Sequence, residues 1–163
     1  MVKGYVGKLL FVALTTKQCH EETLSEDLCR DFMGGYGLGS RILYQRMKPR
    51  ITPLGPDNII GFLTGPLTGT PTMCSGRFVA VSKSPLTGTW GDANCGGDFG
   101  PKLKFAGFDG IFFSGASSDP VYLYVENGKP ELREATELWG KDCLDTEDTL
   151  KKMHGKDTSI ACI

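Results

Sequence analysis

The chain alternates short apolar runs with polar stretches that contain glycine, which predicts many short strands with a few helices between them. The clearest local pattern is a β-hairpin. Residues 121–126 and 129–134 both have strand-forming composition, and the Asn127-Gly128 pair between them favours a type I′ turn. Further strands are expected at 3–14 (as one strand or a bent pair), 58–63, 77–82, 109–115 and 158–163.

Three to four short helices are expected between these strands. Ser25 is a suitable N-cap for a helix over 24–33, and the following Gly34 is a helix stop. Strands and helices do not follow a regular alternating order, so the fold class is predicted to be α+β with mixed or antiparallel sheets. The remaining helical segments are 38–47, 145–155 and one or two turns within 101–107.

Composition and charge exclude several function classes. The formal net charge is −1, so the basic surface of a nucleic-acid binder is not expected. No apolar run approaches the ~18 residues of a membrane span. The run LLFVAL at 9–14 is short for the core of a signal peptide, so a cytoplasmic location is expected.

The length of 163 residues fits one domain. The chain ends in the apolar segment TSIACI (158–163), with no turn or polar tail after it. This ending predicts that residues 1–163 are the front part of a longer chain. The surface that the rest of the longer chain would cover is then exposed, and it is expected to drive self-association into a homo-oligomer.

The six cysteines do not form a metal-binding pattern. Cys19 and Cys29 are the two cysteines nearest to each other in sequence, and no CxxC pair is present. Reduced thiols are therefore expected, and the isolated chain is expected to hold no iron–sulfur cluster. Cys74 and Cys95 lie in the glycine-rich region, where each is expected to be a small buried thiol, with a reactive role as the alternative.

Glycine is in excess, with 22 residues in the chain, and it concentrates in SPLTGTWGDANCGGDFG at 84–100. The pair Gly96-Gly97 allows backbone N–H groups to face a cavity, which is how backbone nests bind phosphate. Arg77 in CSGRF can bind a phosphate bidentately.

Oxygen ligands for a cation stand in the same segment. Asn94 supplies an amide oxygen, and Asp92 and Asp98 supply carboxylates, which are ligands of the type that Mg²⁺ prefers. The glycine-rich stretch is therefore predicted to be a phosphate cradle with a metal, although it lacks the P-loop pattern.

The pentapeptide PLTGT occurs at 66–70 and again at 85–89, each time after a predicted strand. The two copies predict two similar loops at the ends of neighbouring strands, or else two structural turns that merely match. Because these copies flank Arg77 in sequence, residues 77 and 94–97 are predicted to lie together at one rim of the sheets. Lys83, Lys102 and Lys104 either assist a phosphate or are surface charges. No nucleophile–base pair or nucleophile elbow is found, so no catalytic residue is assigned.

Taken in series, several segments resemble the N-terminal domain of the aldehyde ferredoxin oxidoreductases, and the resemblance runs from about residue 4 to the end. The segments are GYVGKLLFVALTT, GGYGLG, TGPLTGT, SGRFVAVSKSPLTG, NCGGDFGPKLKFAGFDGI, PVYLYVENGKPELR and LWGKD followed by TED. The resemblance implies a β-sheet base for a flat tungstopterin cofactor, a bis-molybdopterin with W or Mo.

The resemblance also implies residue roles. Arg77 matches an arginine on a pterin phosphate, and Asn94 matches an asparagine at the Mg that bridges the pterin phosphates. Gly96 and its neighbours Cys95 and Gly97 match backbone that approaches the cofactor, although Cys95 stands where serine is usual. Asp92 is a second departure from the family pattern.

The implied activity is oxidation of an aldehyde to a carboxylic acid with ferredoxin as electron acceptor. The [4Fe-4S] ligands of the family would lie beyond this chain, so the isolated fragment is expected to be inactive. Two alternatives remain: the same domain of an aryl-CoA reductase-type relative, or a non-catalytic pterin-binding or structural module.

Overall fold

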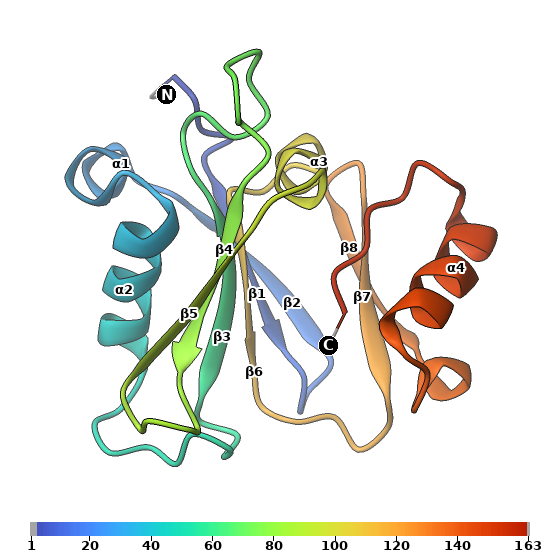
Figure 1. The fold of residues 1–163 in the computed structure, drawn as a ribbon. Helices are drawn as coiled ribbons and strands as arrows, with labels where there is room; N and C mark the ends of the chain where they lie inside the picture. Colours follow the sequence, from blue (N-terminus) through green and yellow to red (C-terminus); the bar gives the residue numbers. More distant parts are fainter. Residues whose placement is uncertain (1–2, 163) are drawn as a thin grey trace.

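A six-stranded sheet forms the centre of the computed structural model, which describes residues 3–162 (Figure 1). Its strand order is β2-β1-β6-β3-β4-β5. β1 and β6 are parallel, while every other neighbouring pair is antiparallel. The strands are β1 (Lys8–Ala13), β2 (Gln18–Thr23), β3 (Ile59–Thr64), β4 (Phe78–Lys83), β5 (Trp90–Cys95) and β6 (Gly110–Ser114).

Both faces of this sheet are covered, but by different elements. On one face, α2 packs against β3 and β4, and α1 packs against α2. On the other face lie α3 and the separate two-stranded sheet of β7 and β8, with α4 alongside (Figure 1). These elements are α1 (Glu26–Phe32), α2 (Gly35–Arg46), α3 (Phe99–Phe105), β7 (Val121–Glu126), β8 (Lys129–Glu134), the short 3₁₀ helix η1 (Thr136–Leu138) and α4 (Cys143–His154).

Side chains alternate along the strands and so build two apolar cores. Leu9 of β1 belongs to the core beneath α1 and α2, whereas Leu10 and Val12 belong to the core beneath α3 and the hairpin. Burying both faces explains why the central strands read as nearly continuous apolar runs. No helix within residues 3–162 is long and apolar enough to cross a membrane.

A buried ion pair ties the N-terminal segment to the sheet. Asp109 is 2% exposed, and its carboxylate accepts hydrogen bonds from the N–H groups of Val6 and Gly7 at 3.1 and 2.7 Å. Lys104 is 8% exposed, and its Nζ lies 3.9 Å from Asp109. Burial lowers the pKa of Lys104, and the nearby Asp109 carboxylate partly offsets that effect.

The ammonium of Lys104 also satisfies two backbone carbonyls. Nζ donates to the oxygen of Gly4 at 2.5 Å and to the oxygen of Gly65 at 2.6 Å. Gly65 follows β3 directly and opens the first PLTGT loop. The buried side chains of Lys104 and Asp109 therefore join α3, the start of β6, the N-terminal segment and the β3–β4 connection.

The predicted α+β class is confirmed, since within residues 3–162 the sheets are mixed and antiparallel and four α-helices accompany them. The type I′ hairpin is confirmed too, because Asn127 and Gly128 both have positive φ, at 51° and 76°. The predicted helix over 38–47 begins earlier than expected, at Gly35.

One predicted strand is absent, and two observed strands were not predicted. The strand expected at 158–163 is absent from residues 158–162, and its last position lies outside the described residues. β2 was not predicted, because its sequence QCHEET is polar and it forms one edge of the sheet. β5 was not predicted either, because WGDANC is rich in residues that are rare in strands.

Replacing Lys104 by Met should destabilise the fold strongly. The variant Lys104→Met leaves the Asp109 carboxylate buried without its ammonium, and breaking a buried pair from one side costs roughly 3–5 kcal/mol. The free energy of unfolding in urea measures this loss. Lys102→Met is the matched control, because Lys102 is exposed on the same helix and should change stability by less than ~0.5 kcal/mol. Equal effects of the two substitutions would contradict a structural role for the pair.

Candidate functional site

Arg77 and Asn94 meet at one rim of the sheet, as the sequence predicted. Phe78 at the start of β4 pairs with Cys95 at the end of β5, which places the residues beside them at the same edge. Nε of Arg77 donates to Oδ1 of Asn94, and Nη2 donates to the Asn94 carbonyl oxygen at 3.3 Å. Both residues are exposed, so this guanidinium lies at the surface.

The register of β4 and β5 decides which side chains share this face. Asn94 pairs with Val79 and Asp92 pairs with Val81, and cross-strand partners point to the same side of a sheet. Side-chain atoms of both valines lie close to glycines of α2, so Asn94 and Asp92 face the α2 side. Cys95 is one position out of phase, so its side chain lies on the opposite face.

The two glycines after Cys95 leave the backbone open beside Arg77. A methyl group on Gly96 would meet only Nη1 of Arg77, at 3.4 Å. Gly97 has a φ of 113°, and nothing lies within 4 Å of the position that its Cβ would take. An exposed guanidinium next to bare backbone suits a phosphate group, so the residues present fit the group that the sequence predicted.

Thr68 supports this rim, and its role was not predicted from the sequence. It is 6% exposed, and its hydroxyl donates to the Arg77 carbonyl oxygen and accepts from the N–H of Gly65, both at 3.0 Å. Gly100 packs on the same spot, because a Cβ there would lie 3.1 Å from the Arg77 carbonyl oxygen. The available signal in the sequence was that Thr68 lies inside the first PLTGT copy.

The two PLTGT copies do not flank Arg77 together. β3, β4 and β5 are successive antiparallel neighbours, so consecutive connections lie at opposite ends of the sheet. The copy at 66–70 lies in the β3–β4 connection beside Arg77, and the copy at 85–89 lies in the β4–β5 connection at the far end. The two copies do follow neighbouring strands, as predicted, but only the first one lies at the rim with Arg77.

The carboxylates proposed as oxygen ligands have protein partners. Asp92 accepts a hydrogen bond from the indole N–H of Trp90 at 2.8 Å, and Asp98 accepts one from the Ser159 hydroxyl at 2.9 Å. Within residues 3–162, no group of three or more His, Cys, Asp or Glu side chains could hold a metal ion. Asn94 remains the candidate cation ligand, since its amide oxygen has a second lone pair beyond the one that Arg77 uses.

The lysine and cysteine candidates are also placed by the fold. Lys104 is buried in the ion pair with Asp109, so it is neither a surface charge nor near enough to solvent to meet a phosphate. Lys83 donates to the Ile51 carbonyl oxygen at 2.7 Å, at the far end of β4. Cys74 and Cys95 are exposed, so the expectation of buried thiols at these two positions is wrong.

Comparison with known proteins places this geometry in an enzyme family. The model of the family described as "Aldehyde ferredoxin oxidoreductase, N-terminal domain" matches residues 9–163. The chain belongs to the aldehyde ferredoxin oxidoreductase family, as its motifs predicted. The family resemblance therefore holds for the segment that contains Arg77 and Asn94.

Relatives with stated activities include tungsten enzymes. A tungsten-containing aldehyde ferredoxin oxidoreductase of Pyrococcus abyssi is 44% identical over 161 residues, which cover 98% of this chain and 26% of the relative. An aliphatic sulfonate oxidoreductase, WOR-like subunit, of Pyrococcus furiosus is 41% identical over 153 residues, covering 91% and 24%. This chain therefore spans about a quarter of the length of the curated relatives that it matches.

A solved structure shares the fold closely. It is the active-site complex BamBC of benzoyl coenzyme A reductase in complex with 1,5-dienoyl-CoA. The TM-score is 0.93 at 34% sequence identity, and the match covers 96% of this chain and 24% of that chain. The domain fold is thus shared by members of the family that differ in their stated substrates.

Gly76 should tolerate a methyl group far less well than Gly96. In Gly76→Ala the new Cβ would lie 2.4 Å from the Gly97 carbonyl oxygen, so the rim backbone must shift. Overpacking of this kind costs roughly 1–3 kcal/mol. Gly96→Ala meets only the flexible end of Arg77 and should cost less than ~0.5 kcal/mol. Urea unfolding of both variants checks the order, and a reversed order would show that the two loops do not touch as described.

Proposed function

We propose that this chain is the cofactor-binding N-terminal domain of a tungsten (or molybdenum) bis-pterin oxidoreductase. The complete enzyme would oxidise aldehydes to carboxylic acids and pass electrons to ferredoxin. Membership of the aldehyde ferredoxin oxidoreductase family supports this assignment. The structural observation that carries it is the surface guanidinium of Arg77, hydrogen-bonded to Asn94 beside the open backbone of Gly96 and Gly97.

In this proposal, the residues of the rim hold the phosphate end of the cofactor. Arg77 binds a pterin phosphate through its guanidinium N–H groups. Asn94 would hold the Mg of the cofactor through its amide oxygen. Gly96 and Gly97 let the backbone approach, and Cys95 contributes only main chain, because its side chain lies on the other face of β5. When bound, the tungstopterin supplies the redox chemistry, while the protein supplies placement and charge neutralisation.

The remaining parts of the proposal concern the complete enzyme. The [4Fe-4S] cluster, the aldehyde pocket and the ferredoxin contact are assigned to segments outside this chain, so the isolated chain should be inactive and free of iron. A cytoplasmic location and a homo-oligomeric state are proposed with it. In this proposal, residues 1–163 form the surface that supports the cofactor and contribute no catalytic residues.

A second candidate is an aryl-CoA reductase-type enzyme that uses the same cofactor. It is favoured by the structural match to the benzoyl coenzyme A reductase complex. The relatives named as aldehyde oxidoreductases favour the first candidate. Assaying the complete enzyme with aldehydes and with aryl-CoA thioesters separates the two. Tungsten or molybdenum without either activity would instead favour a non-catalytic pterin-binding module.

Removing the guanidinium of Arg77 should empty the cofactor site. In the complete enzyme, Arg77→Met should lower the tungsten or molybdenum bound per polypeptide about tenfold, because a charge-assisted contact with phosphate is worth ~1.5–3 kcal/mol. Elemental analysis of the purified protein measures this occupancy. Arg30→Met is the matched control, since Arg30 is an exposed arginine on α1 whose partners are Asp27 and Asp31. Full metal content in Arg77→Met would refute the phosphate role.

A further inference from the structure

Two cysteines, Cys143 and Cys162, lie side by side at the start of α4, and the proposed function uses neither of them. Cys143 is the first residue of α4, and Cys162 lies in the segment that follows the helix. The Cys162 thiol donates a weak hydrogen bond to the Cys143 carbonyl oxygen, with 3.9 Å between the sulfur and the oxygen. Both residues are exposed, so a small molecule in solution can reach their thiols.

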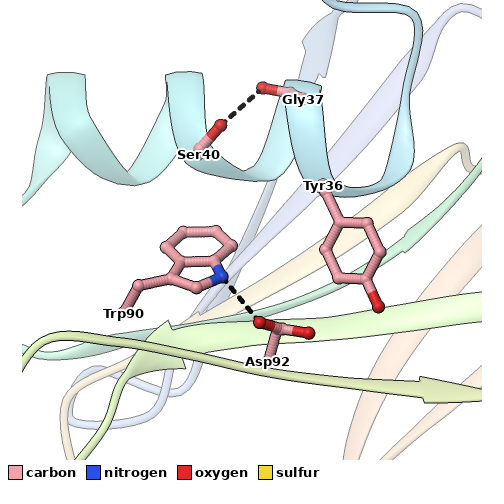
Figure 2. A pocket seen from close by; sticks show the side chains of 5 residues that line it. All are labelled: Tyr36, Gly37, Ser40, Trp90 and Asp92. Atoms are coloured by element: carbon pink, nitrogen blue, oxygen red, sulfur yellow. Dashed lines mark hydrogen bonds between the residues drawn. The ribbon is translucent and has the colours of Figure 1, made fainter. Parts of the chain in front are cut away.

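This pair is remote from the rim and from the face that α2 covers. α4 lies on the side of the six-stranded sheet that carries α3 and the β7–β8 hairpin (Figure 1). The hydrogen bond between Trp90 and Asp92, drawn in Figure 2, lies on the α2 side of the same sheet. The cysteine pair therefore has to be explained on its own.

The chain reversal after α4 brings the two cysteines together. α4 has 12 residues and so rises about 18 Å, and Gly155 ends it with a φ of 101°. The segment 156–162 then runs back beside the helix (Figure 1). An extended segment of this length reaches at most about 23 Å, which is enough to return to the first turn. Cys162 therefore lies opposite Cys143, although they are 19 positions apart.

The surroundings of Cys162 suggest different roles for the two thiols. Partial burial raises the pKa of the Cys162 thiol, and the Cys143 thiol and the Glu147 carboxylate raise it further. A hydrogen bond between the two thiols is among these causes, so the sulfur atoms are neighbours. Because the thiolate is the attacking form of cysteine, Cys162 is poorly suited to begin an exchange reaction. The exposed Cys143 is assigned that first step.

A disulfide bond fits the backbone on both sides of this contact. It requires Cα atoms within roughly 7 Å of each other, and a sulfur 3.9 Å from its partner's carbonyl oxygen is compatible with that separation. Cys74 and Cys95 are exposed as well. Within residues 3–162, however, no hydrogen bond joins either of them to another cysteine, and the Cys95 thiol instead donates to the Gly96 carbonyl oxygen. These two cysteines are therefore internal controls.

The segment 156–162 has few other attachments to the domain. Residues 158–162 form no helix or strand. The Thr158 hydroxyl donates to the His154 carbonyl oxygen at 3.1 Å, and the Ser159 hydroxyl donates to Oδ1 of Asp98 at 2.9 Å. A covalent link at Cys162 would hold this segment beyond both contacts and so restrict its motion.

We propose that Cys143 and Cys162 form a reversible disulfide bond, made by exchange with a small-molecule disulfide, which anchors the segment 156–162 to α4. The Cys143 thiolate attacks one sulfur of that molecule, which forms a mixed disulfide and releases one thiolate. The Cys162 thiolate then attacks Sγ of Cys143 and releases the second thiolate. The two protons lost by the protein thiols end on the two released thiolates. The protein is thus oxidised by two electrons, and the small disulfide is reduced to two thiols.

Oxidation of the reduced 163-residue chain with glutathione disulfide tests the proposal. The remaining thiols are blocked with N-ethylmaleimide, and trypsin then cleaves after lysine. Cys143 is released within residues 142–151, and Cys162 within residues 157–163. Mass spectrometry detects a disulfide between them as the two peptides joined, with the loss of two hydrogen atoms. Electrophoresis without reducing agent, run before the digestion, isolates the monomer, so that links between two chains are counted separately.

The linked pair 142–151 and 157–163 should exceed every other pairing of cysteines in the monomer at least tenfold, and excess glutathione should reopen it. Cys143→Ser should abolish the linked pair and leave Cys162 as a thiol or as a glutathione adduct. Cys74→Ser, the same change at an exposed cysteine outside the pair, should leave the link intact. Amide hydrogen exchange of residues 159–161 should slow at least tenfold in the oxidised chain.

Three results would overturn the inference. The first is that Cys143 and Cys162 end as separate glutathione adducts, or pair with other cysteines as often as with each other. The second is a 143–162 link that occurs only between two chains. The third is unchanged hydrogen exchange of residues 159–161 after the link has formed, because the disulfide would then anchor nothing.

Discussion

The buried hydroxyl of Thr68 is the contact on which the geometry of the rim depends most. It links the Gly65 N–H to the Arg77 carbonyl oxygen, so the two ends of the β3–β4 connection are tied together. Lys104 donates to the carbonyl oxygen of the same Gly65, which also accepts a hydrogen bond from the Thr68 N–H. The exposed, flexible guanidinium of Arg77 therefore starts from a fixed main chain.

Strand register then separates the functions of neighbouring side chains. On the α2 face, β5 presents Trp90, Asp92 and Asn94, whereas Cys95 lies on the opposite face. A strand of unfavourable composition is held in the sheet because β4 supplies a complete antiparallel partner. β5 is the outer edge of the sheet in this chain, and this explains how polar residues can be both ordered and open to a ligand.

Local signals predicted most of the fold. These signals depend on a few adjacent residues, so they predict local structure without knowledge of the topology. They are the Asn127-Gly128 turn, the Ser25 cap and the apolar runs of β3, β4 and β6. The positions of the two PLTGT loops could not be read that way, because they depend on the order of strands in the sheet. β5 was missed for a related reason: WGDANC becomes a strand only through pairing with β4. The meeting of Arg77 with Asn94 was predicted, whereas Thr68 and Trp90 became recognisable only when α2 and β5 were placed side by side.

The central claim is that a phosphate binds where Arg77, Asn94, Gly96 and Gly97 meet. The most direct measurement is a ¹H–¹⁵N titration of the 163-residue chain with inorganic pyrophosphate and Mg²⁺. The account predicts that the backbone signals of Gly96 and Gly97 and the Nε signal of Arg77 shift together, with one saturation curve, while signals of α4 stay in place. Unmoved glycine signals, or shifts confined to lysines elsewhere on the surface, would contradict it.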